Sequence, residues 1–207
     1  MQLIRHLPDE PLFPNGCALT IGNFDGVHIG HQKVLNDLVE QAVCLDLPTL
    51  VMCFEPQPIE YFSEAAAPAR ISTVRDKITE LIKAGVAGLY LARFNDDFSS
   101  MSAESFVRML CQQLNVKLLI VGDDFQFGKN RHGNLAYLKK AGREFGFKVR
   151  DSASFLVNQK RVSSTLIRCA LEEGELDKAS DYLGRRYSMS GRVMHGHKRG
   201  RELGFPT

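Results

Sequence analysis

The sequence predicts an α/β fold with a mostly parallel sheet. Short apolar runs alternate along its 207 residues with longer stretches of helical period, which is the pattern of βαβ units. Each apolar run is closed by polar residues or glycine, as a buried strand would be. The predicted strands are CALTIGN (17–23), TLVMCFE (49–55), AGLYLAR (87–93) and KLLIVGDD (117–124), with shorter candidates at FKVRDS (147–152) and SFLVNQ (154–159).

Helices are predicted between the strands because apolar residues there recur at helical spacing. The first begins near Ile29 and carries one apolar stripe from Val34 to Ala42. Gly85 is well placed to end the second helix. That second helix is predicted at 72–84, and the remaining ones are predicted at 102–114, 133–146, 163–174 and 175–184.

The composition restricts the class of protein. It is 44% hydrophobic and 24% charged, near the average of soluble proteins, and no apolar run approaches the ~18 residues of a membrane span. The N-terminus lacks the pattern of a signal peptide, so a cytoplasmic protein without a membrane partner is expected. The five cysteines are scattered without a CxxC pair, which favours reduced core residues.

The charge gives little sign of a nucleic-acid partner. The net charge is only +2, and the basic cluster HGHKRGR (195–201) is more typical of a solvated loop than of a nucleic-acid site. After Gly184 the helical pattern stops and glycine and arginine become frequent. We therefore predict one domain over 1–183 and, over 184–207, the beginning of a second domain cut short, since about two dozen residues are below the ~40 that fold unaided.

The stretch GNFDGVHIGH (22–31) carries the clearest chemical signal. It joins a predicted strand to a predicted helix, so it lies at the carboxyl edge of the sheet, where open α/β folds bind ligands. The unpaired N–H groups of the first helical turn attract anions, and His28 and His31 share one face of that turn. Gly30 between them leaves room for a large group to approach the backbone.

Three interpretations of this stretch compete. A zinc site is disfavoured because no third cysteine or histidine ligand is near in the sequence. A purely structural turn is the common explanation for a lone histidine, but two histidines around a glycine behind GNFDG weaken it. Binding of a phosphate group is therefore the favoured interpretation.

GNFDGVHIGH resembles the HxGH signature of the nucleotidyltransferase superfamily, in the form found in bacterial bifunctional riboflavin kinase/FAD synthetases. Four further blocks resemble that family in the same order, namely FEPQP (54–58), VGDDFQFGKNRHG (121–133), VSSTLIR (162–168) and GRELGFPT (200–207). The resemblance implies a Rossmann-like nucleotidyltransferase domain with a parallel sheet over 1–183. It also implies the first part of a riboflavin kinase β-barrel over 184–207, so that this chain is expected not to phosphorylate riboflavin.

The family implies an FMN adenylyltransferase, which transfers AMP from ATP to FMN by direct in-line displacement and releases FAD and pyrophosphate, with Mg²⁺ as cofactor. The expected catalytic residues are His28, His31 and Arg168. Residues expected to bind ATP and its phosphates are Gly22, Asn23, Phe24, Gly30, Ser163, Ser164 and Thr165. Residues expected to bind the flavin are Asp123, Asp124, Phe125, Phe127 and Arg131.

Several of these assignments have alternatives. VSSTLIR alone is more typical of a capped helix with a solvent arginine, and only the resemblance favours a phosphate site. Phe125 and Phe127 are equally well explained as core anchors, and FEPQP as a supporting turn. Asp123 or Asp124 could reach Mg²⁺, but the metal ligands are left unassigned.

Two other functions remain open at this point. HxGH alone cannot separate FMN from another phosphate acceptor, such as a nicotinamide or pantetheine phosphate. A nucleic-acid-binding module that uses the basic cluster is the weaker alternative. The expected partners are small-molecule substrates, and the sequence leaves the oligomeric state unknown.

Overall fold

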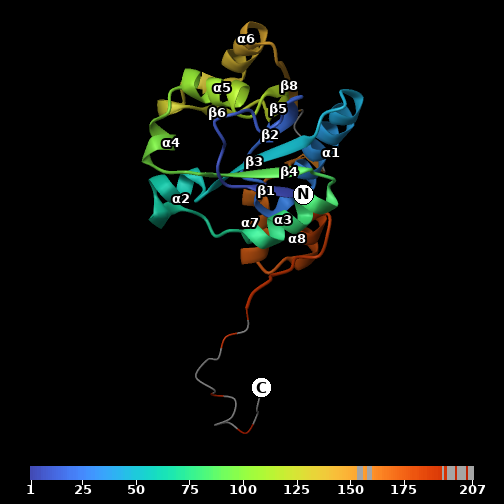
Figure 1. The fold of residues 1–207 in the computed structure, drawn as a ribbon. Coiled ribbons are helices and arrows are strands. Elements are labelled where there is room, and N and C mark those ends of the chain that lie inside the picture. Colours follow the sequence, from blue (N-terminus) through green and yellow to red (C-terminus); the bar gives the residue numbers. More distant parts are fainter. Residues whose placement is uncertain (153–155, 158–159, 193, 195–198, 200–203, 205–207) are drawn as a thin grey trace.

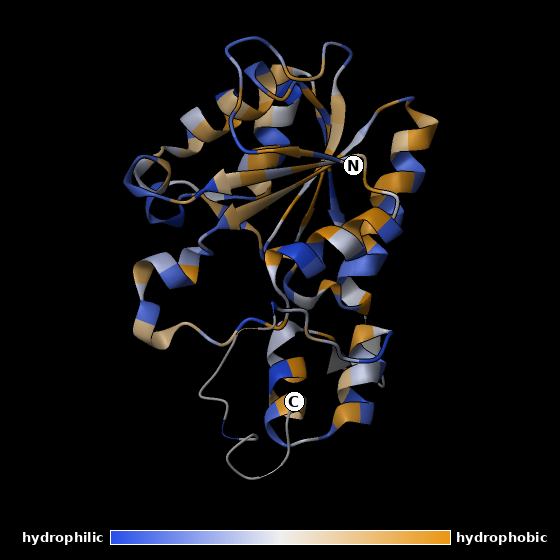
Figure 2. Cartoon of the chain, turned by 60° about the horizontal axis from the view of Figure 1, so that its bottom comes forward, coloured by the Kyte–Doolittle hydropathy of each residue, from blue (hydrophilic) through white to orange (hydrophobic). Residues whose placement is uncertain are grey.

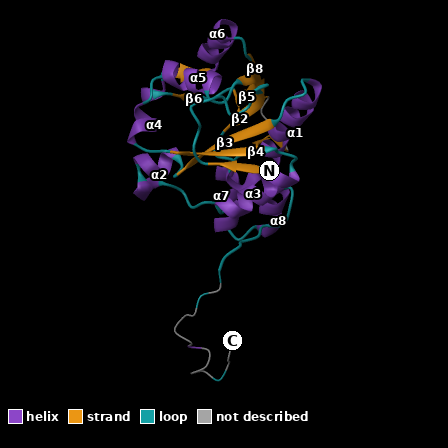
Figure 3. Cartoon of the chain, viewed as in Figure 1, coloured by secondary structure: helices purple, strands orange, loops and turns teal. Residues whose placement is uncertain are grey.

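The centre of the molecule is a six-stranded sheet in which every neighbouring pair of strands is parallel (Figures 1 and 3). The computed structural model describes residues 1–152, 156–157, 160–192, 194, 199 and 204. The strand order is β1-β4-β3-β2-β5-β8. The strands of this sheet are β1 (Gln2–Ile4), β2 (Cys17–Ile21), β3 (Thr49–Glu55), β4 (Gly88–Arg93), β5 (Val116–Gly122) and β8 (Lys148–Ser152). The α/β fold with a parallel sheet is thus confirmed.

Helices follow most of the strands. The α-helices are α1 (Ile29–Cys44), α2 (Pro58–Phe62), α3 (Val74–Lys83), α4 (Asp96–Ser100), α5 (Ala103–Gln112), α6 (Leu135–Phe145), α7 (Ser164–Glu172) and α8 (Leu176–Leu183). Single turns of 3₁₀-helix occur at η1 (Asp25–Val27), η2 (Glu64–Ala66) and η3 (Lys129–Arg131). Two small hairpins pair β6 (Gln126–Phe127) with β7 (Gly133–Asn134) and β9 (Leu156–Val157) with β10 (Lys160–Arg161).

The two faces of the sheet are covered by different helices, because side chains alternate along each strand. In β5, Leu119 and Val121 pack with α5 and α6, whereas Leu118 and Ile120 pack with α1. The same alternation directs Val51 and Cys53 of β3 toward α1 and α3. Figure 2 shows the strands between these layers in hydrophobic colours. Burial on both faces explains why the strands are almost continuous apolar runs.

The order of the strands reverses at β2, which has β3 on one side and β5 on the other. In register, Leu19 lies opposite Leu50 of β3 and Leu119 of β5, so the carboxyl ends of the three strands lie close together. A ligand site is expected in such a crevice, where the loops after neighbouring strands diverge.

Helices α7 and α8 form a smaller unit below the sheet (Figure 1), packed through Ile71, Ile167 and Leu183. The chain leaves α8 through Gly184, whose φ of 69° is the left-handed conformation of a helix C-cap. Beyond it, Arg185 lies 3.5 Å from Glu80 of α3, and the Ser190 hydroxyl donates to Asp76 at 2.5 Å. The predicted boundary between 183 and 184 stays a prediction, since much of 184–207, including most of the basic cluster at 195–201, lies outside the described residues.

The differences from the predicted elements are small. The edge strand β1 and the short helices α2 and α4 were not predicted, because each contains only three to five residues. Of the strand predicted at 154–159, the structure describes Leu156–Val157, which pairs with β10 instead of joining the sheet; 154–155 and 158–159 lie outside the described residues. No helix in the described part of the chain has the length and apolar character needed to cross a membrane.

Candidate functional site

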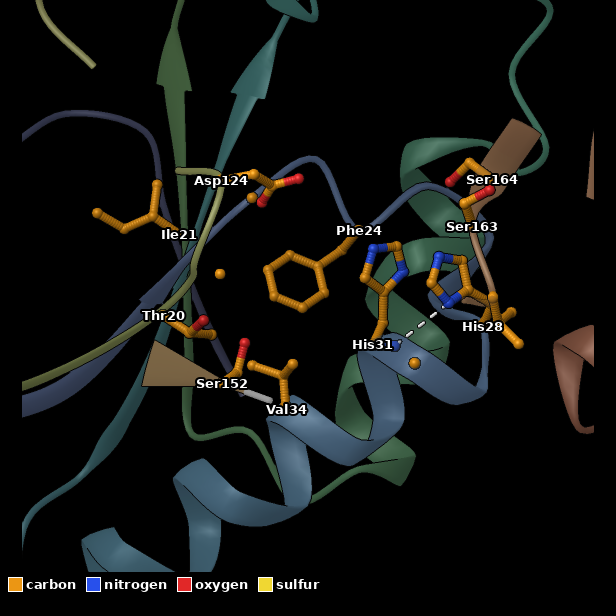
Figure 4. A pocket seen from close by; sticks show the side chains of 14 residues that line it. Thr20, Ile21, Phe24, His28, His31, Val34, Asp124, Ser152, Ser163 and Ser164 are labelled. Atoms are coloured by element: carbon orange, nitrogen blue, oxygen red, sulfur yellow. Dashed lines mark hydrogen bonds between the residues drawn. The ribbon is translucent and has the colours of Figure 1, made fainter. Parts of the chain in front are cut away.

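A cavity of about 280 Å³, here called the histidine pocket, opens at the carboxyl ends of β2, β5 and β8 (Figure 4). The beginning of α1 and the residues before α7 form its other walls. It is lined by Thr20, Ile21, Gly22, Phe24, His28, Gly30, His31, Val34, Gly122, Asp124, Ser152, Val162, Ser163 and Ser164. The pocket therefore lies where the reversal of strand order predicts a ligand site.

His28 and His31 stack on each other at the start of α1. Their ring centroids are 3.6 Å apart with an interplanar angle of 18°, and Phe24 contacts the His31 ring at 4.9 Å. His28 is the N-cap of α1, and its Nδ1 accepts a hydrogen bond from the His31 backbone N–H at 3.3 Å (Figure 4). A Cβ on Gly30 would lie 3.1 Å from the His28 ring, so the glycine makes room for this imidazole.

Both imidazoles are neutral at pH 7. Burial lowers the pKa of His28 to about 4, against an opposing effect of Asp25. Burial, followed by the charges of His28 and Lys77, holds the pKa of His31 well below its usual value. Because Nδ1 of His28 accepts a hydrogen bond, its single proton is on Nε2, which is then a donor.

The turn before α1 has an unusual backbone that is held by a buried carboxylate. Phe24, Gly26 and Val27 have φ values of 47°, 77° and 40°, in the left-handed region that side chains rarely adopt. Asp25 between them is 2% exposed. Its carboxylate accepts from the Ile71 N–H at 3.1 Å, the Ser72 N–H at 3.2 Å and the Arg168 guanidinium at 2.7 Å. Asp25 thus fixes the turn to the loop before α3 and to α7.

Helix α7 closes the same turn from the other side. Ser163 is its N-cap and accepts from the Leu166 N–H, while the Ser164 hydroxyl donates to the backbone carbonyl of Asp25 at 3.2 Å. Arg168 donates to the Ala69 carbonyl at 2.6 Å as well as to Asp25. The Arg168 side chain, 16% exposed, does not line the histidine pocket.

A second clamp holds the backbone of this turn through its carbonyl groups. The Arg185 guanidinium donates to the Gly26 carbonyl at 2.7 Å and to the Val27 carbonyl at 3.3 Å. The Gln32 side-chain amide donates to the carbonyls of Val27 and Leu183 at 3.0 and 2.9 Å. The positive-φ turn is therefore fixed from both ends, which keeps the imidazoles in place.

A larger cavity of about 630 Å³, here called the aromatic pocket, lies beside the histidine pocket. The two pockets are lined by neighbouring residues of the same segments. Asn23 lines the aromatic pocket, whereas Gly22 and Phe24 on either side of it line the histidine pocket. Likewise, Phe125 lines the aromatic pocket and Asp124 lines the histidine pocket. The aromatic pocket is lined by Asn23, Phe54, Pro58, Ile59, Phe62, Phe94, Phe98, Ser99, Met101, Phe106, Phe125, Gln126, Phe127, Gly128, Asn130 and Arg131. Its volume is in the range of sites for small organic ligands.

Aromatic rings form the wall of this pocket in a continuous series. The ring centroids of Phe54 and Phe98 are 5.5 Å apart, and Phe106 contacts Phe127 at 4.9 Å. Phe62 is 67% exposed and contacts Phe94 at 5.6 Å. Ring pairs at these distances provide flat apolar surfaces that suit a planar ligand.

The structure brings together most of the predicted site residues, but in two groups. Eight of them line the histidine pocket: Gly22, Phe24, His28, Gly30, His31, Asp124, Ser163 and Ser164. Four line the aromatic pocket: Asn23, Phe125, Phe127 and Arg131. Asp123, Thr165 and Arg168 line neither pocket. The role of each of these residues stays a prediction.

Two sets of residues were missed by the sequence analysis. The additional phenylalanines of the aromatic pocket, such as Phe94 and Phe106, lie in apolar segments that resemble core in the sequence. Asp25 lay inside the predicted motif, but its partner Arg168 is 143 positions away, so only the fold joins them. The acidic residue inside a glycine-rich turn was the one available signal.

The histidine pocket offers one carboxylate to a metal ion. Within the described ranges, no group of three or more His, Cys, Asp and Glu side chains is arranged to hold a metal ion. Mg²⁺ commonly binds through one or two carboxylates together with substrate phosphates. Asp124 is the one carboxylate among the residues that line the histidine pocket, so these residues fit a Mg²⁺ that enters with a phosphate ligand.

Comparison with known proteins agrees with this geometry. Residues 10–166 match the family model of FAD synthetase, and residues 183–207 match that of riboflavin kinase. A bifunctional riboflavin kinase/FMN adenylyltransferase of Haemophilus influenzae is 50% identical, over 100% of this chain and 68% of its own length. The protein of that name from Escherichia coli K12 is 44% identical over 100% of this chain and 67% of its own length.

A solved structure supports the same fold. It is described as a macrolide-efflux protein from Streptococcus pneumoniae, and it matches with a TM-score of 0.78 and 27% identity. The match covers 100% of this chain and 67% of that one. The FAD synthetase model covers most of the chain, and the relatives match along all of it, so the chain belongs to the FAD synthetase family.

Proposed function

We propose that this chain is an FMN adenylyltransferase, which transfers AMP from ATP to FMN and releases FAD and pyrophosphate. The observation that carries the proposal is that two complementary pockets lie side by side at the turn that contains Gly22, Asn23 and Phe24. The histidine pocket offers imidazole donors at a helix N-terminus, and the aromatic pocket offers flat apolar walls. The names of the relatives, which specify FMN adenylyltransferase, support the same substrates.

In this proposal the phosphate of FMN is the nucleophile. One of its oxygens forms a bond to the α-phosphorus of ATP, the bond from that phosphorus to the bridging oxygen breaks, and pyrophosphate leaves with the electron pair. The second pKa of a phosphate monoester is near ~6, so the nucleophile is already ionised at pH 7. No general base is required, and catalysis depends on placing the two phosphates and stabilising negative charge.

The histidines are assigned to that stabilisation. As neutral imidazoles they donate hydrogen bonds to phosphate oxygens, His28 through Nε2, without first losing a proton. Ser163 and Ser164, which Figure 4 shows beside His28, are assigned to the phosphate groups of ATP. Mg²⁺ would be held by phosphate oxygens with Asp124, and it would neutralise phosphate charge when bound.

The flavin is assigned to the aromatic pocket. Phe62, Phe125 and Phe127 would cover the isoalloxazine ring, and Arg131 at the rim would interact with polar groups of FMN. Asn23 lies between the pockets, where the FMN phosphate would meet the α-phosphate. Arg168 is assigned to holding Asp25 rather than to a phosphate, because its guanidinium is bound there.

The direct test is to incubate the chain with FMN, ATP and Mg²⁺ and to measure FAD and pyrophosphate in equal amounts. His28→Asn keeps a side chain that can cap α1, so it should fold while its turnover falls by roughly 10²–10³-fold, as for loss of a transition-state donor. Glu173→Gln at the exposed end of α7 is a control that should keep full turnover. FAD formation unaffected by His28→Asn would refute the assigned role.

Two related proposals have their own tests. Nicotinamide mononucleotide or pantetheine phosphate in place of FMN should give no adenylylated product, which would separate FMN from the other acceptors. A cytoplasmic location is proposed from the family, and localisation of a tagged chain would check it.

A further inference from the structure

Helix α2 forms part of the aromatic pocket, although none of the residues described for it, Pro58–Phe62, is buried. Ile59 and Phe62 line the cavity and are 46% and 67% exposed. Isolated helices of this length are unstable in water. Because burial contributes little to holding α2 in place, its position depends on the contacts that its polar side chains make.

One guanidinium joins α2 to the end of strand β3. Arg70, in the loop between η2 and α3, donates to the Glu60 carboxylate of α2 at 2.6 Å through both Nε and Nη2. The same side chain donates to Glu55, the last residue of β3, at 2.8 and 3.0 Å. Paired hydrogen bonds between arginine and carboxylates fix the geometry as well as the charge. Because β3 is covered on both faces, Arg70 ties α2 to a fixed part of the sheet.

The two carboxylates need this guanidinium between them. Both accept from the same Nη2 atom of Arg70, so they would repel each other if the guanidinium were absent. The side chains of Arg70, Glu55 and Glu60 are at most 33% exposed, so water screens the interaction only in part. The hydrogen bond from Arg70 lowers the pKa of the Glu60 carboxyl, which is therefore charged at pH 7.

A second contact ties α2 to α4, which lies next to it in Figure 1. The Tyr61 hydroxyl of α2 donates to the Asp96 carboxylate at the start of α4. Phe98 and Ser99 of α4 also line the aromatic pocket. Neither Tyr61 nor Arg70 is among the described residues that line this pocket, so both contacts act on it through the helices that they hold.

We propose that Arg70 is a positioning residue for the flavin: its bridge between Glu55 and Glu60 holds α2 as one wall of the aromatic pocket. The inference rests on the proposed function for the identity of the flavin. A wall that is already in place saves the cost of ordering it when the ligand binds. Loss of Arg70 therefore weakens the binding of the flavin ring, whether or not the ligand carries a phosphate.

The test compares Arg70→Met with Arg108→Met, which removes an exposed arginine that is paired with Glu104 within α5. Dissociation constants are measured for riboflavin and FMN by fluorescence titration and for ATP by calorimetry. Arg70→Met should weaken the binding of both flavins equally, by roughly three- to tenfold as for a partly exposed charge network, and should leave ATP binding unchanged. Arg108→Met should change none of the three dissociation constants.

Two further variants show whether Arg70 acts through α2. Glu60→Gln removes the charge but keeps a residue that can complete the capping box of α2, so it should weaken riboflavin binding as Arg70→Met does. Arg70→Met should have a smaller effect in a chain that already carries Phe62→Ala, because much of the wall is then missing. If Arg70→Met does not fold, Glu60→Gln makes the same comparison with a smaller change.

Three results would overturn the inference. Weaker binding of FMN alone would indicate that Arg70 attracts the phosphate, and riboflavin binding unchanged by Glu60→Gln would indicate that the bridge is not used. Additive effects of Arg70→Met and Phe62→Ala would indicate that Arg70 does not act through α2. Wild-type chain that makes FAD while Arg70→Met binds riboflavin normally would refute only this inference. Wild-type chain that makes no FAD but shows the equal loss for both flavins would refute only the proposed function.

Discussion

Removing the Asp25 carboxylate should unfold the turn that carries the site. Asp25→Ala leaves the Arg168 guanidinium, 16% exposed, without its ion-pair partner, and it leaves the backbone N–H groups of Ile71 and Ser72 without an acceptor. Breaking a buried ion pair on one side costs about 3–5 kcal/mol, because the remaining charge stays buried. Arg168 keeps the Ala69 carbonyl, so we expect the lower part of that range, about 3 kcal/mol.

This loss is large for a domain that is stable by roughly 5–15 kcal/mol. It corresponds to a decrease of roughly 6–12 °C in the midpoint of thermal unfolding for a chain of this size. Urea unfolding followed by circular dichroism measures the free energy, and its slope against urea concentration should be unchanged. Asp25→Asn keeps an oxygen acceptor and should lose less.

The matched control is Asp151→Ala, which removes the exposed ion pair with Lys139 at 3.0 Å. Exposed pairs contribute little, so this variant should unfold as the wild type does. Replacing both Asp25 and Arg168 by alanine should lower the free energy of unfolding by less than the sum of the two single replacements. The double variant no longer contains a buried guanidinium without an ion-pair partner. If Asp25→Ala and Asp151→Ala unfold at the same urea concentration, the carboxylate does not hold the turn.

Three further predictions concern His28, Phe62 and the cysteines. The pKa of His28 is about 4 in the folded chain and 6.5 as its ordinary value, so between these pH values the unfolded chain binds more protons than the folded chain. The free energy of unfolding should therefore fall as the pH decreases from 6.5 to 4, by about 3 kcal/mol in total. In urea unfolding, His28→Asn should show a free energy of unfolding that depends less on pH. Phe62→Ala should weaken FMN binding roughly 3- to 10-fold in a fluorescence titration without changing stability. The control Phe145→Ala, on an exposed part of α6, should leave FMN binding unchanged. Equal FMN affinity in the two variants would argue against the aromatic pocket as the flavin site. A thiol reagent at pH 8 should modify exposed thiols first, as burial raises the pKa of the others, and mass spectrometry should find Cys44 and Cys169 labelled before Cys17 and Cys53.

The central elements of the fold were predictable because burial leaves a direct mark on the sequence. Strands β2, β3, β4 and β5 are covered on both faces, so each is an almost unbroken apolar run between polar residues. The edge strand β1 has two exposed residues in three, and its neighbours Arg5 and His6 are polar. Its place in the sheet is set by pairing with β4, some 85 positions away, which no local pattern records.

The site was predictable only in its local part. A glycine-rich turn before a helix binds anions through its own N–H groups, so the sequence alone indicated the chemistry of the histidine pocket. The aromatic pocket could not be predicted in the same way. Phe54, Phe94 and Phe106 come from three separate segments, and an aromatic residue that lines a cavity has the same sequence pattern as one in the core.

The arrangement of charges explains how His28 and His31, the proposed phosphate donors, would act without being charged. The turn at Phe24–Val27 is held by Asp25, Arg168, Arg185 and Gln32, so its donors are already in position before a ligand binds. Preorganised donors stabilise developing charge without a cost of reorganisation. A protonated histidine pair would repel itself at a centroid distance of 3.6 Å, whereas two neutral rings stack.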